Sequence, residues 1–380
     1  MYSVVVKAIK VQIYPNEQQQ ELIVKTVGCC RFVYNWALEK KIAFYQSAKK
    51  SISKWTLISE LTKLKEDKNN EWLNEVPSQS LQQSIADLDT AFSRFFKKNS
   101  VFPKFKSKKK AKQSYRIPQS FEVNRDAHYL KLPKLGWIRF IDEFNVPSCA
   151  DFRNISVSME DGKYFASLCY KTAETPMALK PIESDKTVGI DLGLTTLATF
   201  SDGTKVKNPR HLRKHEETIK KEQQILSKKK EGTKAYEKQK GKLNRAHKKV
   251  ANARRDFLHK LTTSLVDNQN WTSFCVEDLD VKGMQQNSHL ARSIGDVGWR
   301  MFRSMMEYKC KDKGKNLVVI GRFDASSKAC TCGSVNQNLT LADRIWTCSS
   351  CGKLHDRDIL ASNNIKCFGL RKAGQSLLTA

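Results

Sequence analysis

The chain has 380 residues, of which 67 are Lys or Arg and 39 are Asp or Glu, so its formal net charge is +28. Hydrophobic residues make up 40% of the sequence, which is enough to form real cores and argues against a disordered chain. A charge of this size in a long chain is typical of proteins that bind polyanions, and nucleic acid is the leading candidate partner. No apolar run approaches the roughly 18 residues of a membrane span, so we expect a soluble protein without a membrane partner.

The N-terminus and the cysteines favour a reducing, cytoplasmic location. Residues 1–14 alternate like a strand and lack the small-residue cleavage site of a secretory signal. Four of the eleven cysteines cluster between Cys330 and Cys351 and the others are scattered, which is not the pattern of a disulfide scaffold. We therefore expect reduced thiols, with a metal at the cluster.

Helical spacing follows the first strand and extends over residues 17–96. Within it, Pro77 and a capping Ser78 predict the start of a helix with one apolar face. Amide side chains in the first turn of that helix could pair bidentately with base edges, although helix capping and solvent exposure explain them equally well. The candidate contacts to base edges are Ser78, Gln79 and Gln82.

A strongly basic segment follows this helix. Residues 92–116 contain ten Lys or Arg and no Asp or Glu. Phe102, Phe105 and Tyr115 lie among these cations and could stack on bases or sugars while the basic side chains hold phosphates. The alternative is a solvated loop with a few core anchors. The candidate phosphate contacts are Lys104, Lys106 and Arg116.

Short strand-like runs occupy residues 114–171 and are separated by turn signals such as Asp161-Gly162. This pattern predicts a small β-barrel or sandwich. The stretch 174–184 contains two prolines and no periodicity, which is typical of a linker. We therefore place a domain boundary near residue 183.

Half of the net charge lies in residues 205–260, which contain twenty Lys or Arg and six Asp or Glu. Gly232-Thr233 interrupts this segment, and apolar residues then recur at three-to-four spacing up to Leu265. We expect a basic helical hairpin at about residues 211–265 whose charged face contacts phosphates, although charged faces are often only solvated. The candidate contacts are Lys248, Lys249 and Arg254.

Three acidic residues stand at the ends of hydrophobic strands or at the start of a helix. Asp191 interrupts a buried-type strand between Gly189 and Gly193, two glycines that would let the backbone approach a ligand closely. Glu277 ends a second hydrophobic strand, and Asp358 opens a short helix. Each acid alone could be an exposed hairpin residue, a cap or a surface charge.

Taken together, the three acids meet the requirements of a two-metal phosphodiester hydrolase. Mg²⁺ prefers oxygen ligands, and two such ions can activate the attacking water and stabilise the leaving oxygen. The sequence therefore predicts a site for two Mg²⁺ ions at Asp191, Glu277 and Asp358.

The cysteine cluster has the spacing of a structural zinc site. Cys330 and Cys332 form a short CxC pair, and Cys348 and Cys351 form a CxxC pair fifteen residues later. Four thiolates at this separation predict one Zn²⁺. If Cys330 cannot reach the ion, His355 or water could complete the tetrahedron, and four reduced thiols without zinc are the alternative.

With these motifs the chain resembles the TnpB family, transposon-encoded RNA-guided nucleases regarded as ancestors of type V CRISPR effectors. The resemblance covers nearly the whole chain and includes Phe102-Pro103-Lys104-Phe105-Lys106-Ser107. Its most specific motifs are Gly189-Ile190-Asp191-Leu192-Gly193, Val276-Glu277-Asp278-Leu279, Gly298-Trp299, Ser326-Ser327-Lys328 and His355-Asp356-Arg357-Asp358.

The resemblance implies an α/β multidomain protein with a RuvC-like RNase H-fold nuclease domain, in which Asp191, Glu277 and Asp358 are the Mg²⁺ ligands. It also implies an inserted zinc ribbon and an N-terminal β-barrel that carries a helical recognition lobe. The implied domains are a wedge barrel over 1–12 and 113–182, a recognition domain over 13–112, a nuclease domain over 183–324 and 355–380, and a zinc-binding domain over 325–354.

The implied activity is RNA-guided cleavage of DNA. Such proteins bind a guide RNA from the transposon end, recognise a short duplex motif beside the target and open the duplex, so that guide pairing selects the sequence. The implied protein is a monomeric ribonucleoprotein in the cytoplasm of a prokaryote, on the nucleoid when bound to double-stranded target DNA. A guided DNA-binding regulator without cleavage and a strand-transfer transposition enzyme are the alternatives.

The chain departs from the family pattern at two places. The first knuckle of the family is CxxC, whereas Cys330 and Cys332 are one residue closer. The family's asparagine-alanine-alanine after the last acid is replaced by Ile359-Leu360-Ala361. Asp358 itself is retained, which argues against the nuclease-dead relatives that have lost their catalytic acids.

Overall fold

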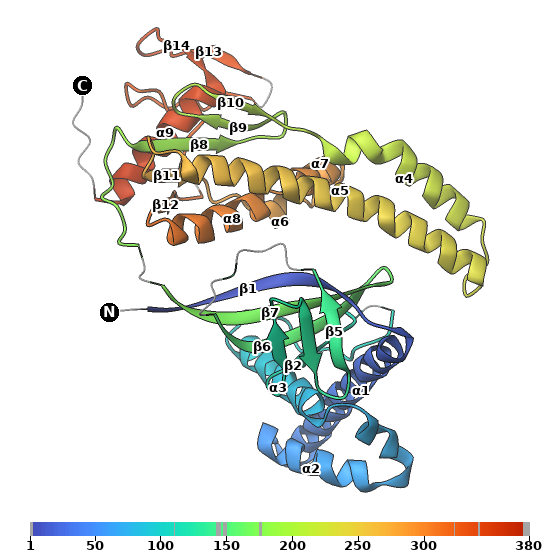
Figure 1. Ribbon diagram of the computed structural model, residues 1–380. Coiled ribbons are helices and arrows are strands. Elements are labelled where there is room, and N and C mark those ends of the chain that lie inside the picture. The colour runs from blue at the N-terminus through green and yellow to red at the C-terminus, as the bar shows by residue number, and fades with distance from the viewer. Residues whose placement is uncertain are drawn as a thin grey trace. The chain divides into compact units, whose positions relative to one another are not determined.

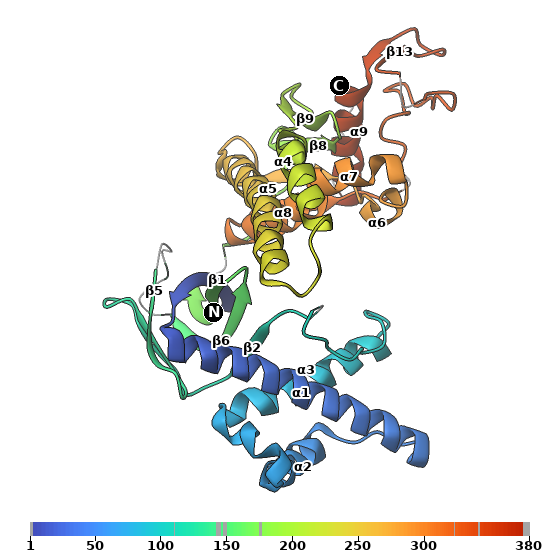
Figure 2. The ribbon, with the colours of Figure 1, turned by 90° about the vertical axis from the view of Figure 1, so that its right-hand side faces the viewer.

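The computed structural model describes residues 3–109, 111–141, 146, 150–174, 177–322, 324–340 and 343–374. The chain divides into two compact units, Met1–Thr175 and Pro176–Ala380, and each has its own hydrophobic core. Figures 1 and 2 show the elements of each unit. The described helices include none that is long and apolar enough to cross a membrane.

The first unit contains a seven-stranded antiparallel sheet in the order β2-β6-β7-β1-β5-β4-β3. β1 pairs with β7 over most of its length and with β5 near its end, where Ile13 faces Phe140. No ladder joins the edge strands β2 and β3 among the described residues, so closure into a barrel stays a prediction. The strands are β1 (Ser3–Tyr14), β2 (Ser114–Ile117), β3 (Glu122–Asn124), β4 (Tyr129–Leu132), β5 (Gly136–Phe140), β6 (Asp151–Glu160) and β7 (Lys163–Glu174).

Helices follow β1 directly, as the sequence predicts. They are α1 (Glu17–Ala48), α2 (Lys54–Glu66), the 3₁₀ helix η1 (Lys68–Glu75) and α3 (Ser78–Phe96). α1 begins with a capping box in which Asn16 and Gln19 bond each other's backbone N–H. The prediction that Ser78 caps α3 is wrong: Pro77 is the N-cap, and the Ser78 hydroxyl instead accepts a hydrogen bond from Lys65.

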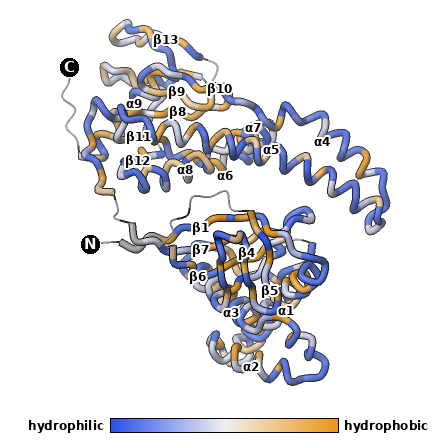
Figure 3. The backbone as a smooth tube through the Cα atoms, in the orientation of Figure 1, coloured by the Kyte–Doolittle hydropathy of each residue, from blue (hydrophilic) through white to orange (hydrophobic). Residues whose placement is uncertain are grey.

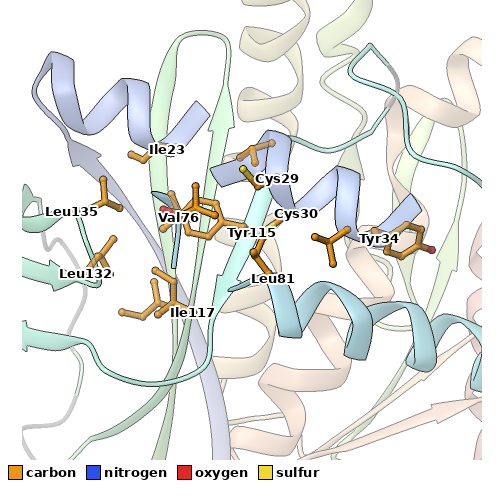
Figure 4. Packing of buried hydrophobic residues seen from close by; sticks show 14 of the residues in the cluster. Ile23, Cys29, Cys30, Tyr34, Val76, Leu81, Tyr115, Ile117, Leu132 and Leu135 are labelled. Carbon is orange, nitrogen blue, oxygen red and sulfur yellow. The ribbon is translucent and has the colours of Figure 1, made fainter. Parts of the chain in front are cut away.

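The core of the first unit joins α1, α3 and the sheet. Figure 4 shows Ile23 and Cys30 of α1 with Leu81 of α3 and Tyr115 and Ile117 of β2. Tyr115 is only 5% exposed, so the prediction that it stacks on bases is wrong. Its ring belongs to the apolar core, and burial raises the pKa of its hydroxyl.

The second unit contains a mixed sheet in the order β10-β9-β8-β11-β12. β8 pairs antiparallel with β9 on one side and parallel with β11 on the other, and β12 extends the parallel part. The strands are β8 (Thr187–Leu192), β9 (Thr196–Phe200), β10 (Lys205–Lys207), β11 (Ser273–Val276) and β12 (Asn316–Val319), and a separate hairpin is formed by β13 (Ile345–Thr347) and β14 (Leu354–Asp356).

A long helical hairpin projects beyond this sheet (Figure 1). Its arms are α4 (His211–Ser227) and α5 (Lys234–Asp267), which end two residues beyond the predicted region of about 211–265. Figure 3 shows that both are largely hydrophilic. Leu258 and Leu265 of α5 join the core with Phe274 and Phe302. The remaining helices are α6 (Val281–Met284), α7 (Ser288–Val297), α8 (Trp299–Asp312) and α9 (Arg357–Lys372).

Helix α9 lies directly against the centre of the sheet and leaves no room for a side chain at two positions. A Cβ atom on Gly189 of β8 would collide with the backbone oxygen of Ser362 and lie 2.7 Å from the backbone nitrogen of Lys366. A Cβ atom on Gly369 of α9 would likewise collide with the sulfur of Cys275 in β11. Glycine at these positions therefore sets the distance between helix and sheet.

We predict that Gly189→Ala lowers the free energy of unfolding by at least about 2 kcal/mol, because backbone atoms of α9 cannot move aside without shifting the helix. Chemical denaturation of the full chain measures this. The matched control is Gly241→Ala within α5, where the added methyl meets only an arginine tip at 3.6 Å. That substitution should stabilise by about 0.5–1 kcal/mol, and equal effects at the two positions would contradict the packing argument.

Candidate active site and cysteine cluster

Strand register places Asp191 and Glu277 at the same level on neighbouring strands. Ile190 of β8 faces Val276 of β11 in the parallel ladder, so the next residue of each strand path is an acid. Asp191 itself faces Thr199 in the antiparallel ladder with β9. The two carboxylates therefore lie beside each other where the parallel pair of strands ends.

The first turn of α9 brings Asp358 to the same place. The Asp356 side chain caps the helix by accepting hydrogen bonds from the N–H groups of Asp358 and Ile359 at 3.0 and 3.1 Å. Ser362, which contacts Gly189, follows Asp358 by one helical turn on the same face. α9 therefore carries Asp358 toward Asp191, two residues beyond Gly189.

Sequence reasoning gave the wrong role to the two glycines beside Asp191. Gly189 makes room for α9 rather than for a ligand, and a Cβ on Gly193 would lie 2.6 Å from the backbone oxygen of Thr196. Gly193 thus belongs to the tight connection between β8 and β9, where its N–H donates to Leu197. The ligand-facing chemistry of this motif rests on Asp191 alone.

The charges of Glu277 and Asp358 both act on Asp191. Burial, together with the charges of Glu277 and Asp358, raises the pKa of Asp191 to about 7 against the opposing effects of Arg357 and Arg344. Burial likewise raises the pKa of Glu277, which Ser326 partly offsets by donating a hydrogen bond to its carboxylate. Mutually repelling carboxylates of this kind fit a site for hard divalent cations.

Three residues outside the predicted set position the acids. Ser326 donates to Glu277, and Arg344 forms an ion pair with Asp358 at 3.3 Å. The side-chain amide of Asn364 on α9 donates to the backbone oxygens of Ser326 and Ala329, both at 2.7 Å. Ser326 lies in a family motif, but no feature of the sequence alone indicates Arg344 or Asn364.

A cavity of about 440 Å³ opens beside Glu277 and is lined by residues of β11, α6 and α8. The neighbouring Asp278 is held by two cations, Arg303 at 2.6 Å and Arg322 at 3.1 Å. These bonds lower the pKa of Asp278. Asp278 therefore fixes the chain that follows Glu277, and it is a poor metal ligand because both of its oxygens are occupied.

The four predicted cysteines come together in the second unit. Their sulfur atoms all lie within 4.8 Å of one another, with 3.6 Å between Cys330 and Cys351 and 3.7 Å between Cys332 and Cys348. A tetrahedral Zn–S bond of about 2.3 Å places sulfurs about 3.8 Å apart. The cluster can therefore hold a metal ion of that size.

The shortened CxC pair reaches the cluster through a turn similar to that of the second pair. Gly333 and Gly352 each follow a cysteine at positive φ, 92° and 72°, and each N–H bonds back to the first cysteine of its pair. His355 lies 3.1 Å from the Cys330 sulfur, as a neighbour of a complete four-sulfur set rather than a replacement for one member.

A hydroxyl group prepares two of the thiols for metal binding. Ser334 Oγ lies 3.0 Å from the sulfur of Cys348 and 3.2 Å from that of Cys332. Hydrogen bonds from Ser334 and from the backbone lower the pKa of Cys348 to about 5, and Ser334 also lowers the pKa of Cys332. By contrast, hydrogen bonds with the other thiols raise the pKa of Cys351 to about 11. The thiolate is the form that binds metal, so the hydroxyl favours occupancy.

Comparison with known proteins agrees with this architecture. Family models match residues 167–288 (OrfB_IS605, "Probable transposase"), residues 299–365 (Cas12f1-like TNB domain) and residues 1–50 (helix-turn-helix domain). A Streptomyces pristinaespiralis protein described as "Putative RNA-guided DNA endonuclease" is 38% identical, and the match covers 97% of this chain and 91% of the relative. The chain belongs to the TnpB family.

Two further relatives support this membership of the TnpB family. "Putative RNA-guided DNA endonuclease InsQ" of Escherichia coli K12 is 31% identical, with 96% of this chain and 92% of that protein covered. The solved structure titled "Cryo-EM structure of the Cas12f1-sgRNA-target DNA complex" matches with a TM-score of 0.58 at 11% identity, over 96% of this chain and 99% of that one. The shared fold confirms the predicted mixed α/β architecture.

The predicted nucleic-acid contacts of this TnpB-family chain differ in their surroundings. Ser78, Gln82 and Lys104 are exposed, and Gln79 is partly buried. Arg116 pairs with Asp87 at 3.3 Å, Lys106 lies 3.7 Å from the centre of the Tyr34 ring, and Arg254 pairs with the buried Asp296 at 3.0 Å. On α5, Lys249 is exposed and Lys248 is partly buried. All nine contacts stay predictions.

We predict that Asp191→Asn stabilises the metal-free protein at pH 8. The pKa of Asp191 rises from 3.8 to about 7 on folding, so the folded state binds more protons and loses stability as pH rises through that interval. The gain of the variant should therefore vanish near pH 4. Thermal unfolding with and without Mg²⁺ measures it, and Mg²⁺ should raise the melting temperature of the wild type more than that of the variant.

Asp278→Asn is the matched control for this prediction. Its carboxylate has a lowered pKa because Arg303 and Arg322 bind it, so the amide should destabilise the protein at pH 8. If Asp191→Asn and Asp278→Asn change the stability at pH 8 in the same direction, the result would contradict the assignment of unbalanced negative charge to Asp191.

Proposed function

We propose that this protein is an RNA-guided DNA endonuclease of a transposon. It binds a guide RNA derived from the element, recognises a short duplex motif beside the target and hydrolyses target DNA at Asp191, Glu277 and Asp358. The observation that carries the proposal is the convergence of these three carboxylates in a RuvC-like fold, with the pKa of Asp191 raised by burial and by the charges of the other two. Relatives named RNA-guided DNA endonucleases, which match over nearly the whole chain, support the guided part.

The donor set suits Mg²⁺, because it consists of carboxylate oxygens and carries more negative charge than its neighbours offset. Asp191, Glu277 and Asp358 would hold two ions, which when bound supply activation of water and stabilisation of the leaving oxygen.

The protein's own residues orient the acids for this task. Ser326 donates to one oxygen of Glu277 and Arg344 binds one oxygen of Asp358, so the second oxygen of each carboxylate stays available. Asp278, held by Arg303 and Arg322, fixes the backbone beside Glu277. Catalysis of this kind depends on fixed geometry, because small displacements of ligands cost large factors in rate.

We also propose that Cys330, Cys332, Cys348 and Cys351 hold one structural Zn²⁺. Sulfur spacing near that of a tetrahedral site and the Ser334 hydrogen bonds support the proposal. The ion would fix the segment between the cysteine pairs, which includes Arg344. Zinc would thereby contribute to the geometry at Asp358 without touching substrate.

The domains keep the boundaries that the family resemblance implies. In this proposal the wedge, over 1–12 and 113–182, grips the RNA scaffold, and the recognition domain, over 13–112, reads the duplex motif. The hairpin α4–α5 holds the backbone of the heteroduplex, and its density of Lys and Arg supports this role. The assembly is a monomeric ribonucleoprotein that acts in the prokaryotic cytoplasm.

The experiment that tests the proposal starts from RNA that co-purifies when the protein is expressed with its flanking DNA. One discrete RNA that maps to the flank and ends in a variable segment is expected, and it should direct Mg²⁺-dependent cleavage of matching DNA. Asp191→Ala should reduce cleavage by at least about 10³-fold while target binding persists. Asp280→Asn, in the cavity beside Glu277, is the control and should keep most activity.

Other outcomes would reject parts of this function. Heterogeneous RNA after a high-salt wash would remove guidance and leave a basic DNA-binding nuclease. Target occupation without cleavage by the wild type, unchanged in Asp191→Ala, would favour a regulator. Strand-transfer products would favour a transposition enzyme.

For the cysteine cluster we predict one zinc per chain by elemental analysis and none in Cys348→Ser. The variant should also show a lower melting temperature, because metal binding contributes directly to folding. Cys169→Ser, in the sheet of the first unit, is the control and should retain the zinc. Zinc retained in Cys348→Ser, or lost equally in both variants, would contradict the four-sulfur site.

A further inference from the structure

A cluster of phenylalanines at the end of α3 has no role in the nuclease site. Phe96, the last residue of α3, is 72% exposed, and Phe102 in the following segment is 44% exposed. Phe105 further along is 57% exposed. Single exposed apolar side chains are common, but a group of large ones on the surface often marks a binding site.

A chain reversal builds this cluster. Lys98 adopts a left-handed φ of 57°, and the N–H groups of Lys98 and Asn99 bond back to the carbonyls of Phe95 and Arg94. The reversal returns Phe102 to the helix. We call the resulting four rings the aromatic platform; they are Phe92, Phe95, Phe96 and Phe102.

Ring geometry ties the platform together. Phe102 meets Phe92 and Phe95 edge-on, with ring centres 5.5 and 5.3 Å apart. Phe96 stacks on Phe92 at 6.2 Å with an interplanar angle of 25°. Phe92 and Phe95 thus contact Phe96 directly, and Phe102 packs against both of them. Phe96 is the most exposed of the described large hydrophobic side chains after Val101.

Contacts to α1 hold the platform in place. The side chain of Asn35 makes two hydrogen bonds to the backbone of Lys106, at 2.8 and 2.9 Å. Lys41 lies 5.4 Å from the centre of the Phe92 ring and donates to the carbonyl of Ile52. The rings are therefore fixed before any ligand binds, which lowers the entropic cost of binding.

Charge identifies the kind of partner. The platform lies within residues 92–116, which contain ten basic residues and no acid. A second copy of this chain, with a net charge of +28, would meet this surface with like charge. A polyanion that carries flat apolar groups fits both the cations and the rings. Duplex DNA fits less well, because it presents only the edges of its bases.

We propose that the aromatic platform stacks on unpaired nucleotides, with the surrounding lysines and arginines on their phosphates. Aromatic stacking accepts any base, so the site binds single-stranded RNA or DNA without reading sequence. The proposal rests on the proposed function for the presence of a nucleic-acid partner, and it adds a contact made where that partner is not paired.

The test compares full-length Phe96→Ala, Phe96→Leu and Phe96→Trp with the wild type. Probes are a single-stranded RNA, a single-stranded DNA and a blunt duplex of the same sequence, each containing 2-aminopurine, whose fluorescence falls on stacking. Phe96→Ala and Phe96→Leu should weaken binding to single strands at least about fivefold and leave duplex affinity within about twofold. Phe96→Trp should bind and quench like the wild type.

Trp55→Ala is the matched control, because Trp55 on α2 is 69% exposed and lies outside the acid-free segment. It should leave all three affinities unchanged. Equal losses on single strands and duplex would overturn the proposal, as would wild-type binding by Phe96→Ala. Wild-type binding by Phe96→Leu would show an aliphatic contact instead of stacking, and a monomer–dimer equilibrium lost in Phe96→Ala would assign the platform to a second copy.

Comparison of the single-stranded RNA probe with the single-stranded DNA probe identifies which of the two nucleic acids the platform binds. Failure of this proposal is separate from failure of the nuclease proposal, because guide co-purification and Mg²⁺ cleavage by the wild type do not depend on Phe96. If the Phe96→Ala variant cleaves normally and binds single strands like the wild type, only the aromatic-platform proposal is rejected. If the wild type binds single strands through Phe96 but carries no discrete RNA, only the proposed RNA-guided function is rejected.

Discussion

The contact between α9 and β8 at Gly189 is the constraint on which the nuclease site depends. Two backbones meet there without a side chain between them, and Asp358 and Asp191 lie one helical turn and two strand residues away. A helix resting on side chains would stand several ångströms further from the sheet. The carboxylates of Asp358 and Asp191 would then lie further apart, so the absence of one Cβ atom helps to bring these two acids toward each other.

Bringing three carboxylates together costs stability because like charges repel. Side chains from the segments around the cysteine cluster offset part of this cost by binding two of the carboxylates. Arg344, between the two cysteine pairs, binds Asp358, and Ser326, just before the first pair, binds Glu277. Asn364 then ties α9 to the same stretch. In the proposed function, a metal ion would hold this small module, and the module would in turn hold the three acids.

Much of this arrangement follows from local sequence patterns, and the rest depends on contacts that no local pattern encodes. Alternation and apolar spacing predicted β1, the helices and the basic hairpin, and strand-terminal acids predicted Asp191 and Glu277. Tyr115 was misjudged because a tyrosine among lysines has the same sequence pattern whether its ring faces solvent or core. Gly189 was misjudged because the helix that needs it lies more than 160 residues later in the chain.

The opposite signs of charge in the protein have complementary uses. A net charge of +28 attracts nucleic acid over long range, and about half of it lies on or near the α4–α5 hairpin. At the end of β8 and β11 the local sign is reversed, because three acids outnumber the arginines that reach them. A phosphate would be repelled from that point unless cations joined it. In the proposed function, the same protein would therefore bind a polyanion broadly and, where the three acids meet, make the approach of a phosphodiester depend on divalent ions.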